Sequence, residues 1–351
     1  MRFKDTDRGF ERPRVSLKNE LNEATEIEQL REALRRSLQN EAKLRRRTDD
    51  LVEAIYRAAK DAALASGRPK PLPKIKKDRR SNRGEIALIH TTDYQAGKKT
   101  TSFDLKILRS RIELFTDKVL HLTEIQRAHH PVREGVLMIG GDMVEGLTVF
   151  PGQSYEVEAH LFDQLFEVTT ILETMIRKLA ANFETFRVVC EFGNHGRIGR
   201  KGDLPAADNI DRMAYRIVED KVKDLNIGWQ ASDNFYQLVK VGDAYRALLF
   251  HGDEVNSYGG AIPAYGIIKK VSAWASGVLG ETFTDAYCGH FHSVMTLPLP
   301  NGGRVFVTGS PESDNTYAKA FVAATSRPSQ RLHFIDSEKP RVTAEYVVWL
   351  D

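Results

Sequence analysis

The spacing of apolar residues changes twice along this chain, near residues 67 and 85, and therefore predicts three segments. From about residue 16 to residue 65 the interval is three or four residues, which predicts a helix. The first apolar series consists of Ile27, Leu30, Leu34 and Leu38, and a second begins at Leu44. Because the phase slips between the two series, the segment is either one imperfect coiled coil or a helical hairpin. A coiled coil here would join two copies of the chain as a homodimer.

Residues 67–84 show almost no apolar periodicity. They include three prolines, eight basic residues and one acidic residue, which is the composition of an extended linker. The segment is either a solvated tether or a contact for nucleic acid. We therefore expect a helical or coiled-coil arm at 1–66, a basic proline-containing linker at 67–84 and a larger domain at 85–351.

From residue 85 the pattern alternates between strand and helix. Short apolar, β-branched runs predict strands at 85–90, 135–140 and 185–192, with amphipathic helices between them at about 103–129 and 155–182. This alternation favours parallel pairing of the three strands. A third helix is expected at about 205–225. The remainder is rich in strand patterns, and we expect a meander interrupted by one helix near 262–279.

Composition narrows the class of protein. Apolar residues make up 41% and charged residues 28%, as in ordinary globular proteins. Cys190 and Cys288 lie in apolar stretches, so we expect buried free thiols in a reducing compartment and no disulfide framework. No apolar run is long enough to cross a bilayer, and the first residues lack the apolar core of a signal peptide. These features predict a cytoplasmic protein without a membrane partner.

The net charge of +3 conceals an uneven distribution. Residues 1–83 contain 23 Lys and Arg against 14 Asp and Glu, whereas the remaining residues contain 28 against 34. A basic arm joined to an acidic body predicts that the arm contacts nucleic acid or another polyanion.

Polar clusters follow each of the strands predicted to be parallel. The residues concerned are Asp93 and Gln95, then Asp142 and Glu145, then Asn194 and His195. Later predicted strands end in His251 and in the pair His290 and His292. The carboxyl ends of parallel strands gather at one edge of a sheet, so these side chains are expected to converge. If the chain is extended at the histidine pair, both rings lie on the same face.

Oxygen and nitrogen ligands without thiolates suit divalent first-row metals such as Mn²⁺, Fe²⁺ and Zn²⁺. A central Asp can bridge two ions about 3.5–4 Å apart, the spacing used for phosphoryl displacement. Glycines flank several members of the set and allow tight turns after the strands. Any one of these clusters is common by itself, whereas the series of five in this order indicates a two-metal site.

The series Asp-x-Gln, Gly-Asp-x-x-Glu, Gly-Asn-His, His-Gly and Gly-His-x-His, within residues 85–310, resembles the calcineurin-like metallophosphoesterases. The resemblance implies an α/β fold with a two-sheet mixed β-sandwich flanked by helices, to which the N-terminal helical arm is added. It implies that a first metal ion is held by Asp93, Gln95, Asp142 and His292. A second ion would be held by Asp142, Asn194, His251 and His290. His195 would protonate the leaving oxygen or stabilise charge on the phosphoryl group.

Two positions depart from the family's pattern. Gln95 stands where the family usually has His, and its harder amide oxygen favours Mn²⁺ or Mg²⁺ in the first site. We therefore expect Mn²⁺, with Mg²⁺, Fe²⁺ and Zn²⁺ as alternatives. Gly196 stands where an acidic residue usually follows the catalytic histidine, so the sequence does not indicate what orients His195. Glu145 is expected to lie outside the ligand set.

The family includes nucleases, protein phosphatases and nucleotide phosphodiesterases. The basic arm, the possible dimerising helix and a general similarity to Mre11/SbcD-type nucleases and phage-encoded relatives favour a DNA or RNA nuclease. One alternative is a small-molecule or cyclic-nucleotide phosphodiesterase or phosphatase. Another is a non-catalytic nucleic-acid-binding or assembly protein with a degenerate site. In the polar segment 308–330, Ser310, Tyr317 and Arg327 either contact substrate or belong to an ordinary surface loop.

Overall fold

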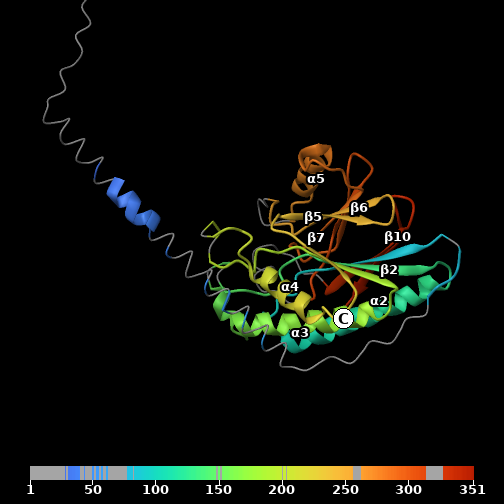
Figure 1. Cartoon of the computed structure of the whole chain (residues 1–351), viewed down its shortest axis with the longest axis horizontal. Helices are drawn as coiled ribbons and strands as arrows, with labels where there is room; N and C mark the ends of the chain where they lie inside the picture. Colours follow the sequence, from blue (N-terminus) through green and yellow to red (C-terminus); the bar gives the residue numbers. More distant parts are fainter. Residues whose placement is uncertain are drawn as a thin grey trace, which may run out of the picture. The chain divides into compact units, whose positions relative to one another are not determined.

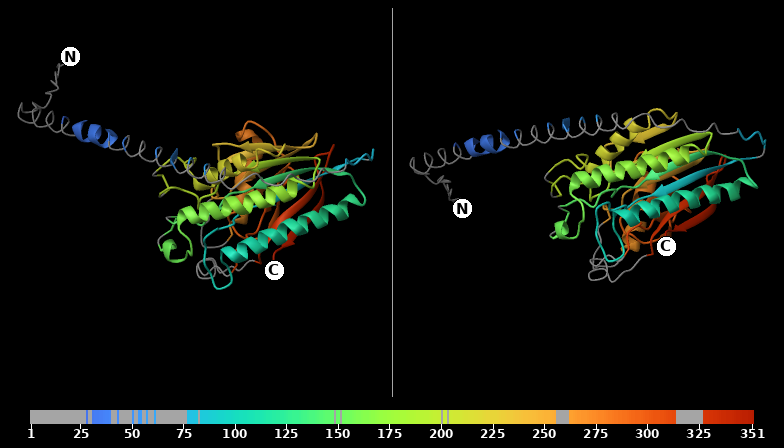
Figure 2. Two further views of the ribbon diagram at one scale, coloured as in Figure 1. Left: turned by 60° about the horizontal axis from the view of Figure 1, so that its bottom comes forward. Right: turned by 90° about the horizontal axis from the view of Figure 1, so that it is seen from below.

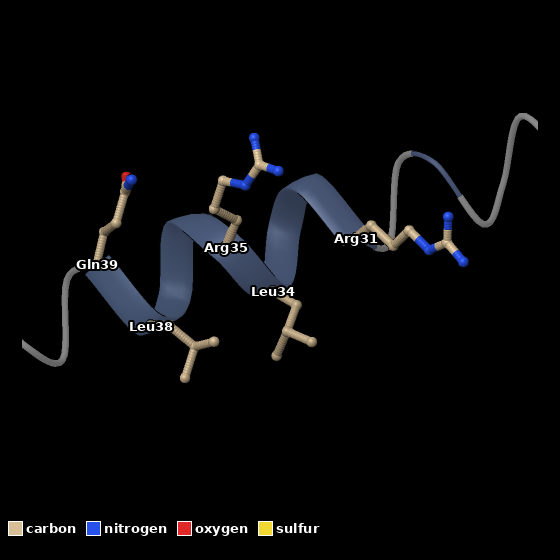
Figure 3. Close-up of a pocket in the computed structure, with 5 residues that line it drawn as sticks. All are labelled: Arg31, Leu34, Arg35, Leu38 and Gln39. Atoms are coloured by element: carbon tan, nitrogen blue, oxygen red, sulfur yellow. The ribbon is translucent and has the colours of Figure 1, made fainter.

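The computed structural model describes residues 28, 31–39, 43, 50, 53, 54, 57, 61, 77–81, 83–147, 149, 150, 152–199, 201, 202, 204–255, 262–313 and 327–351. The chain divides into two compact units, Met1–Ala58 and Ala59–Asp351. In the first unit, residues 31–39 are helical, as the apolar spacing predicts. Leu34 and Leu38 point to one side of this helix, and Arg35 and Gln39 point to the other (Figure 3). Most of the predicted helix at 16–65 lies outside the described residues.

Six strands form the first sheet, in the order β11-β10-β1-β2-β3-β4. Their bounds are Glu85–Thr91 for β1, Val132–Ile139 for β2, Thr185–Cys190 for β3, Gly228–Ala231 for β4, Ser329–Asp336 for β10 and Val342–Trp349 for β11. Strands β1 to β4 are parallel, which confirms the pairing predicted from the strand–helix alternation. Strands β10 and β11 add an antiparallel edge beside β1.

Five strands form the second sheet, in the order β5-β6-β7-β9-β8. They span Tyr236–Val241 (β5), Tyr245–Phe250 (β6), Asp285–Cys288 (β7), Met295–Pro298 (β8) and Arg304–Val307 (β9). The prediction of one late meander is wrong in two respects. Strand β6 pairs parallel with β7 and β7 with β9, and β10 and β11 belong to the first sheet. An alternating apolar pattern marks a strand but does not specify its neighbour.

Helices cover the outer faces of both sheets (Figure 1). On the first sheet lie α2 (Leu105–Arg127), α3 (Leu161–Ala180) and α4 (Ile210–Lys221), with α2 beside α3 and α3 beside α4 (Figure 2). Helix α5 (Ala264–Ala273), continued by η2 (Trp274–Val278), covers the second sheet. A short 3-10 helix, η1 (Gln153–Tyr155), precedes α3. The predicted two-sheet mixed sandwich flanked by helices is confirmed. None of the helices among the described residues is long and apolar enough to cross a membrane.

Apolar side chains from both sheets meet in the centre of the sandwich. Alternate residues of β1, such as Ile86 and Leu88, pack with residues of β6, such as Ala247 and Leu249, because successive strand residues point to opposite faces. All four are at most 4% exposed. The two sheets are therefore held against each other by a continuous apolar core below the strand ends.

A buried polar seam interrupts this core. Tyr287 Oη lies 2.9 Å from both Tyr245 Oη and His333 Nδ1, and His90 Nδ1 lies 2.7 Å from Thr308 Oγ1. Burial, together with the charge of Arg331, lowers the pKa of His90 to about 3 and lowers that of His333 well below its usual value. Both imidazoles are therefore neutral in the folded protein.

Acid should destabilise the fold through these two histidines. In the unfolded chain each imidazole takes up a proton near its ordinary pKa of about 6.5, whereas in the folded chain it does so only at much lower pH. The free energy of unfolding is therefore expected to fall below about pH 6.5, by about 1.4 kcal/mol per pH unit for each histidine. Urea unfolding of the metal-free protein between pH 5 and 8 measures this slope. In the variant His333→Gln one fewer proton is taken up on unfolding, so the slope should be smaller by about 1.4 kcal/mol per pH unit. Equal slopes for the variant and the wild type would contradict the prediction.

Candidate metal centre

The predicted ligand residues lie just beyond the carboxyl ends of five strands. Asp93 and Gln95 follow β1, Asp142 follows β2, and Asn194 follows β3. His251 follows β6, and His290 and His292 follow β7. The first sheet thus supplies carboxylate and amide groups, and the second supplies imidazoles. The two sets face each other at one end of the sandwich, because the strands that carry them are parallel within each sheet.

The structure brings all seven side chains together. His251 Nε2 lies 3.0 Å from Asp142 Oδ2 and 3.2 Å from Asn194 Oδ1. Ligand atoms of Asp142, His251 and His290 all lie within 4.8 Å of one another. Gln95 Nε2 lies 3.4 Å from both Asp142 Oδ2 and His292 Nε2. His292 Nε2 is in turn 3.5 Å from Asp93 Oδ1. Asp142 therefore occupies the centre, because its Oδ2 is near both His251 and Gln95, which belong to the two different predicted ligand groups.

The backbone at these positions is unusual. Among the non-glycine residues that the structure describes, positive φ occurs at five positions, and all five belong to the predicted ligand set. They are Asp93 (56°), Gln95 (49°), Asp142 (53°), His290 (66°) and His292 (50°). A left-handed conformation costs a non-glycine residue about 1–2 kcal/mol. Strain of this kind concentrates at functional sites, where the surrounding structure imposes it.

His290 and His292 do not lie on an extended strand, so that part of the prediction is wrong. Strand β7 ends at Cys288, and both histidines adopt left-handed conformations in the bend that follows. The backbone N–H of His290 lies 3.0 Å from both carboxylate oxygens of Asp93, which fixes this bend against the loop after β1. Both imidazoles still reach the site.

Two glycines are required by close packing around the carboxylates. A Cβ atom on Gly193 would collide with the carboxylate of Asp142, and one on Gly289 would collide with that of Asp93. The loops after β3 and β7 can therefore approach these carboxylates only where the side chain is hydrogen.

Asp211, in the first turn of α4, holds two of the ligand loops together. Its buried carboxylate accepts hydrogen bonds from the backbone N–H groups of Asp142 (2.8 Å), Met143 (3.0 Å), Val144 (3.3 Å) and Gly193 (3.0 Å). Burial and the nearby charge of Asp142 raise the pKa of Asp211 to about 6. The sequence analysis missed this residue. The one feature of the sequence that could have pointed to Asp211 is its position two residues after Asn209, the residue that caps α4.

The chemistry of the set suits divalent cations. The carbonyl oxygen of Gln95 is buried without a hydrogen-bond partner among the described residues, although a buried oxygen normally has one. Burial alone would raise the pKa of Asp142, but the adjacent imidazoles lower it, so this residue is a carboxylate. Two carboxylates, two amide oxygens and three imidazoles, with no thiolate, are suitable ligands for Mn²⁺, Fe²⁺ or Zn²⁺.

His195 lies beside this set and is 16% exposed at its side chain. Its Nδ1 donates a hydrogen bond to the carbonyl oxygen of Glu145 at 2.7 Å and lies 3.4 Å from the Glu145 carboxylate. Its Nε2 faces Asp142 at 4.0 Å. Burial lowers the pKa of His195, but the charges of Asp142 and Glu145 outweigh this effect and raise it to about 9. Glu145 thus orients the imidazole from a different loop.

The side chain of Asn209 explains why residue 196 is glycine. A Cβ atom at this position would collide with the side-chain oxygen of Asn209, which caps helix α4. An acidic side chain therefore has no room after His195, and Glu145, which is 1% exposed, takes its place.

The predicted substrate contacts after β9 have different surroundings. Ser310 is 1% exposed, and its hydroxyl donates a hydrogen bond to the carbonyl oxygen of Asp93 at 2.7 Å, so it supports a ligand loop rather than lining an open groove. Arg327 pairs with Asp351 at 2.6 Å, and its side chain is 68% exposed. Tyr317 lies outside the described residues. Two residues that the sequence analysis missed, Lys98 and Glu312, are buried near the site.

No protein-family model and no curated protein sequence matches the chain. Among solved structures, the chain is similar to Vps29 of Entamoeba histolytica complexed with zinc, with 10% identity over 76% of this chain and 99% of that one, at a TM-score of 0.33. A predicted phosphoesterase from Streptococcus pneumoniae is 12% identical over 76% and 99%, at a TM-score of 0.31. A 5'-nucleotidase from Candida albicans is 12% identical over 78% and 53%, at a TM-score of 0.33. These scores are too low to support an inference about activity, which must come from the site.

Replacing Asp211 by Ala should destabilise the protein and the site together. Up to four buried N–H groups lose their acceptor, at about 1–3 kcal/mol each, so we expect a loss of more than about 3 kcal/mol in urea unfolding. Asp208→Ala removes a partly exposed carboxylate three residues earlier and should cost less than about 0.5 kcal/mol. Similar stabilities of the two variants would show that the loops after β2 and β3 do not depend on Asp211.

Proposed function

We propose that the chain is a metal-dependent phosphoester hydrolase of the calcineurin-like metallophosphoesterase superfamily. The observation that carries this proposal is the convergence of seven polar side chains on one end of the sandwich, five of them on left-handed backbone. The first metal ion is assigned to Asp93, Gln95, Asp142 and His292. The second is assigned to Asp142, Asn194, His251 and His290.

When bound, two divalent cations neutralise phosphate charge and lower the pKa of water to near neutrality. The protein's own contribution is positioning. Asp142 faces both groups of ligands and fixes their relative positions. The backbone N–H of His290 donates to Asp93, and this hydrogen bond joins the loops after β1 and β7. His195 is the proton donor to the leaving oxygen, because Glu145 occupies its Nδ1 and leaves Nε2 directed at the site.

Mn²⁺ is the proposed metal. The first group contributes three oxygen ligands and one imidazole, which favours a harder cation than Zn²⁺. Equilibrium binding with Mn²⁺, Mg²⁺, Fe²⁺ and Zn²⁺ in parallel tests this choice, and a stoichiometry approaching two ions per chain is expected. Absence of binding for all four ions would overturn the proposed function.

Two substitutions separate metal binding from chemistry. His195→Ala is expected to retain the metal but to lower turnover of a chromogenic phosphodiester by about 10²–10⁴-fold, the contribution of a positioned proton donor. Asp142→Asn should lose both ions and the activity, because the shared charge is removed. His160→Ala is the control, since this exposed histidine at the start of α3 makes no side-chain capping bond. Loss of metal in His195→Ala would show that His195 is itself a ligand.

We propose further that the substrate is DNA or RNA. The supporting feature is the excess of basic over acidic residues at 1–83, at 23 against 14, because backbone phosphates attract such a segment. A small-molecule or cyclic-nucleotide diester, and a non-catalytic binding or assembly role, are the alternatives. A substrate panel with single- and double-stranded DNA, RNA, cyclic nucleotides and a chromogenic diester distinguishes them. The N-terminal helix is proposed as a homodimer contact, which sedimentation tests.

Truncation tests the role of the arm. Arg80 and Arg83 are bonded to the rest of the second unit, since Arg80 donates to the carbonyl oxygens of Arg127 (2.8 Å) and His130 (3.1 Å), and Arg83 pairs with Asp336. The deletion should therefore remove residues 1–76 and keep these contacts. The truncated protein is expected to hydrolyse a chromogenic diester as well as the full chain does.

The same truncated protein should bind nucleic acid more weakly. The slope of log affinity against log salt should fall by about 0.7–0.9 for each phosphate contact that is lost. An unchanged affinity and salt slope would assign the arm to assembly alone, and would favour the small-molecule alternative.

A further inference from the structure

Two buried glutamates outside the ligand set each hold the outer nitrogen of an imidazole in the site. Glu312 Oε2 lies 2.9 Å from His292 Nδ1, and Glu145 Oε2 lies 3.4 Å from His195 Nδ1. Both carboxylate side chains are at most 2% exposed. A carboxylate on one imidazole nitrogen fixes the ring's tautomer and orientation, so that the other nitrogen points at the reaction centre. At His292 the carboxylate of Glu312 is the nearer partner, whereas at His195 the carboxylate of Glu145 acts together with the Glu145 carbonyl oxygen, which lies 2.7 Å from Nδ1.

A buried ammonium group pairs with one of these two glutamates, Glu145. Lys98 Nζ lies 3.3 Å from Glu145 Oε1 and 2.7 Å from Glu156 Oε2, and the side chain is 3% exposed. Lys98 also belongs to the loop of the predicted ligand Gln95, since its backbone N–H donates to the Gln95 carbonyl oxygen at 2.9 Å. Any movement of this ammonium therefore affects both a ligand loop and the loop that orients His195.

The segment that carries Glu312 is fastened to the same loop. Thr100 Oγ1 donates to the Ser313 carbonyl oxygen at 2.8 Å, and the Ser102 and Ser313 hydroxyls are 2.8 Å apart. Ser310 adds its hydrogen bond to Asp93. Glu312 is thus held beside the loop of Lys98. Burial lowers the pKa of Lys98, but the charges of Glu145, Glu156 and Glu312 together outweigh this and raise it, so the side chain is an ammonium ion.

We propose that Lys98 is a positioning residue that acts through Glu145 and Glu312, and so fixes the proton donor His195 and the first-site ligand His292 with one charge. The inference rests on the proposed function. Buried carboxylates without a compensating cation are costly and tend to take up protons or move. Without Lys98, Glu145 loses a buried ammonium at 3.3 Å, and the charge of the loop that is bonded to the Glu312 segment is removed. The two imidazoles then lose their orientation together.

The ordinary alternative is an ion pair that only stabilises the fold. Three measurements separate the two: the Mn²⁺ affinity of each ion by calorimetry, kcat at saturating Mn²⁺ on a chromogenic phosphodiester, and thermal stability. Glu312→Gln should weaken one of the two ions by about 10–100-fold and leave kcat within about threefold. Glu145→Gln should leave both affinities within about threefold and lower kcat by about 10-fold or more. These variants define the two separate effects.

Lys98→Met is expected to show both effects at once in the folded protein. Lys98→Gln, which keeps hydrogen-bond donors without the charge, is expected to do the same and serves if Lys98→Met does not fold. Lys98→Arg, which keeps the charge, should restore both readouts partially and together. The matched control is Lys99→Met, because Lys99 is 50% exposed and pairs with Asp104 and Glu158 away from the imidazoles. That control should leave affinities and kcat within about threefold of wild type.

A folded Lys98→Met or Lys98→Gln protein with unchanged affinities and kcat would overturn this proposal, as would the loss of only one effect. Failure of the proposed function gives a different result, since the wild-type protein would then bind no Mn²⁺.

Discussion

The left-handed backbone at Asp93, Gln95, Asp142, His290 and His292 is the constraint on which the rest of the site depends. Each of these residues turns its side chain inward at a cost of about 1–2 kcal/mol, and none of the five turns would persist alone. The surrounding groups impose them. Asp211 accepts the backbone N–H of Asp142 and of its two successors, and Asp93 accepts the backbone N–H of His290. Carboxylates thus satisfy backbone donors that the turns expose.

The sandwich provides the frame for these turns. Parallel strands β1 to β3 end at the same edge of the first sheet, and the parallel pair β6 and β7 ends opposite them in the second. The apolar core holds the sheets at a fixed separation, so imidazoles from one sheet reach carboxylates from the other. The polar seam around Tyr287 adds hydrogen bonds between the sheets and makes this frame sensitive to acid through His90 and His333.

Much of this arrangement could be predicted from the sequence. Helices and parallel strands follow from the periodicity of apolar residues, as in α2, where Asp104 caps the first turn and Leu108, Ile112 and Phe115 are buried. The convergence of the seven polar residues follows from their places after strands. Sheet order after β5 could not be predicted, because apolar alternation does not specify a strand's neighbour.

The supporting residues also escaped prediction. Asp211, Glu312 and Lys98 act through contacts with other segments of the chain. Asp211 contacts Asp142 across 69 positions, Lys98 contacts Glu145 across 47, and Glu312 contacts His292 after two intervening strands. A single Asp, Glu or Lys in a sequence carries no sign of such a contact. The left-handed turns at His290 and His292 were unexpected for a similar reason, since non-glycine residues rarely adopt them without an external constraint.

The two departures from the family's pattern have separate physical consequences. Gly196 is enforced by the side chain of Asn209, and the carboxylate of Glu145 lies beside His195 instead, so the role proposed for His195 does not require an acidic residue at position 196. Gln95 has no such compensation: its amide lies 3.4 Å from both Asp142 and His292 through Nε2, and its buried carbonyl oxygen has no hydrogen-bond partner among the described residues. The first group therefore has three oxygens and one imidazole, whereas the second has two of each. Oxygen ligands favour harder cations, so the two positions should differ in metal preference, and the first should exchange more readily than the imidazole-rich second.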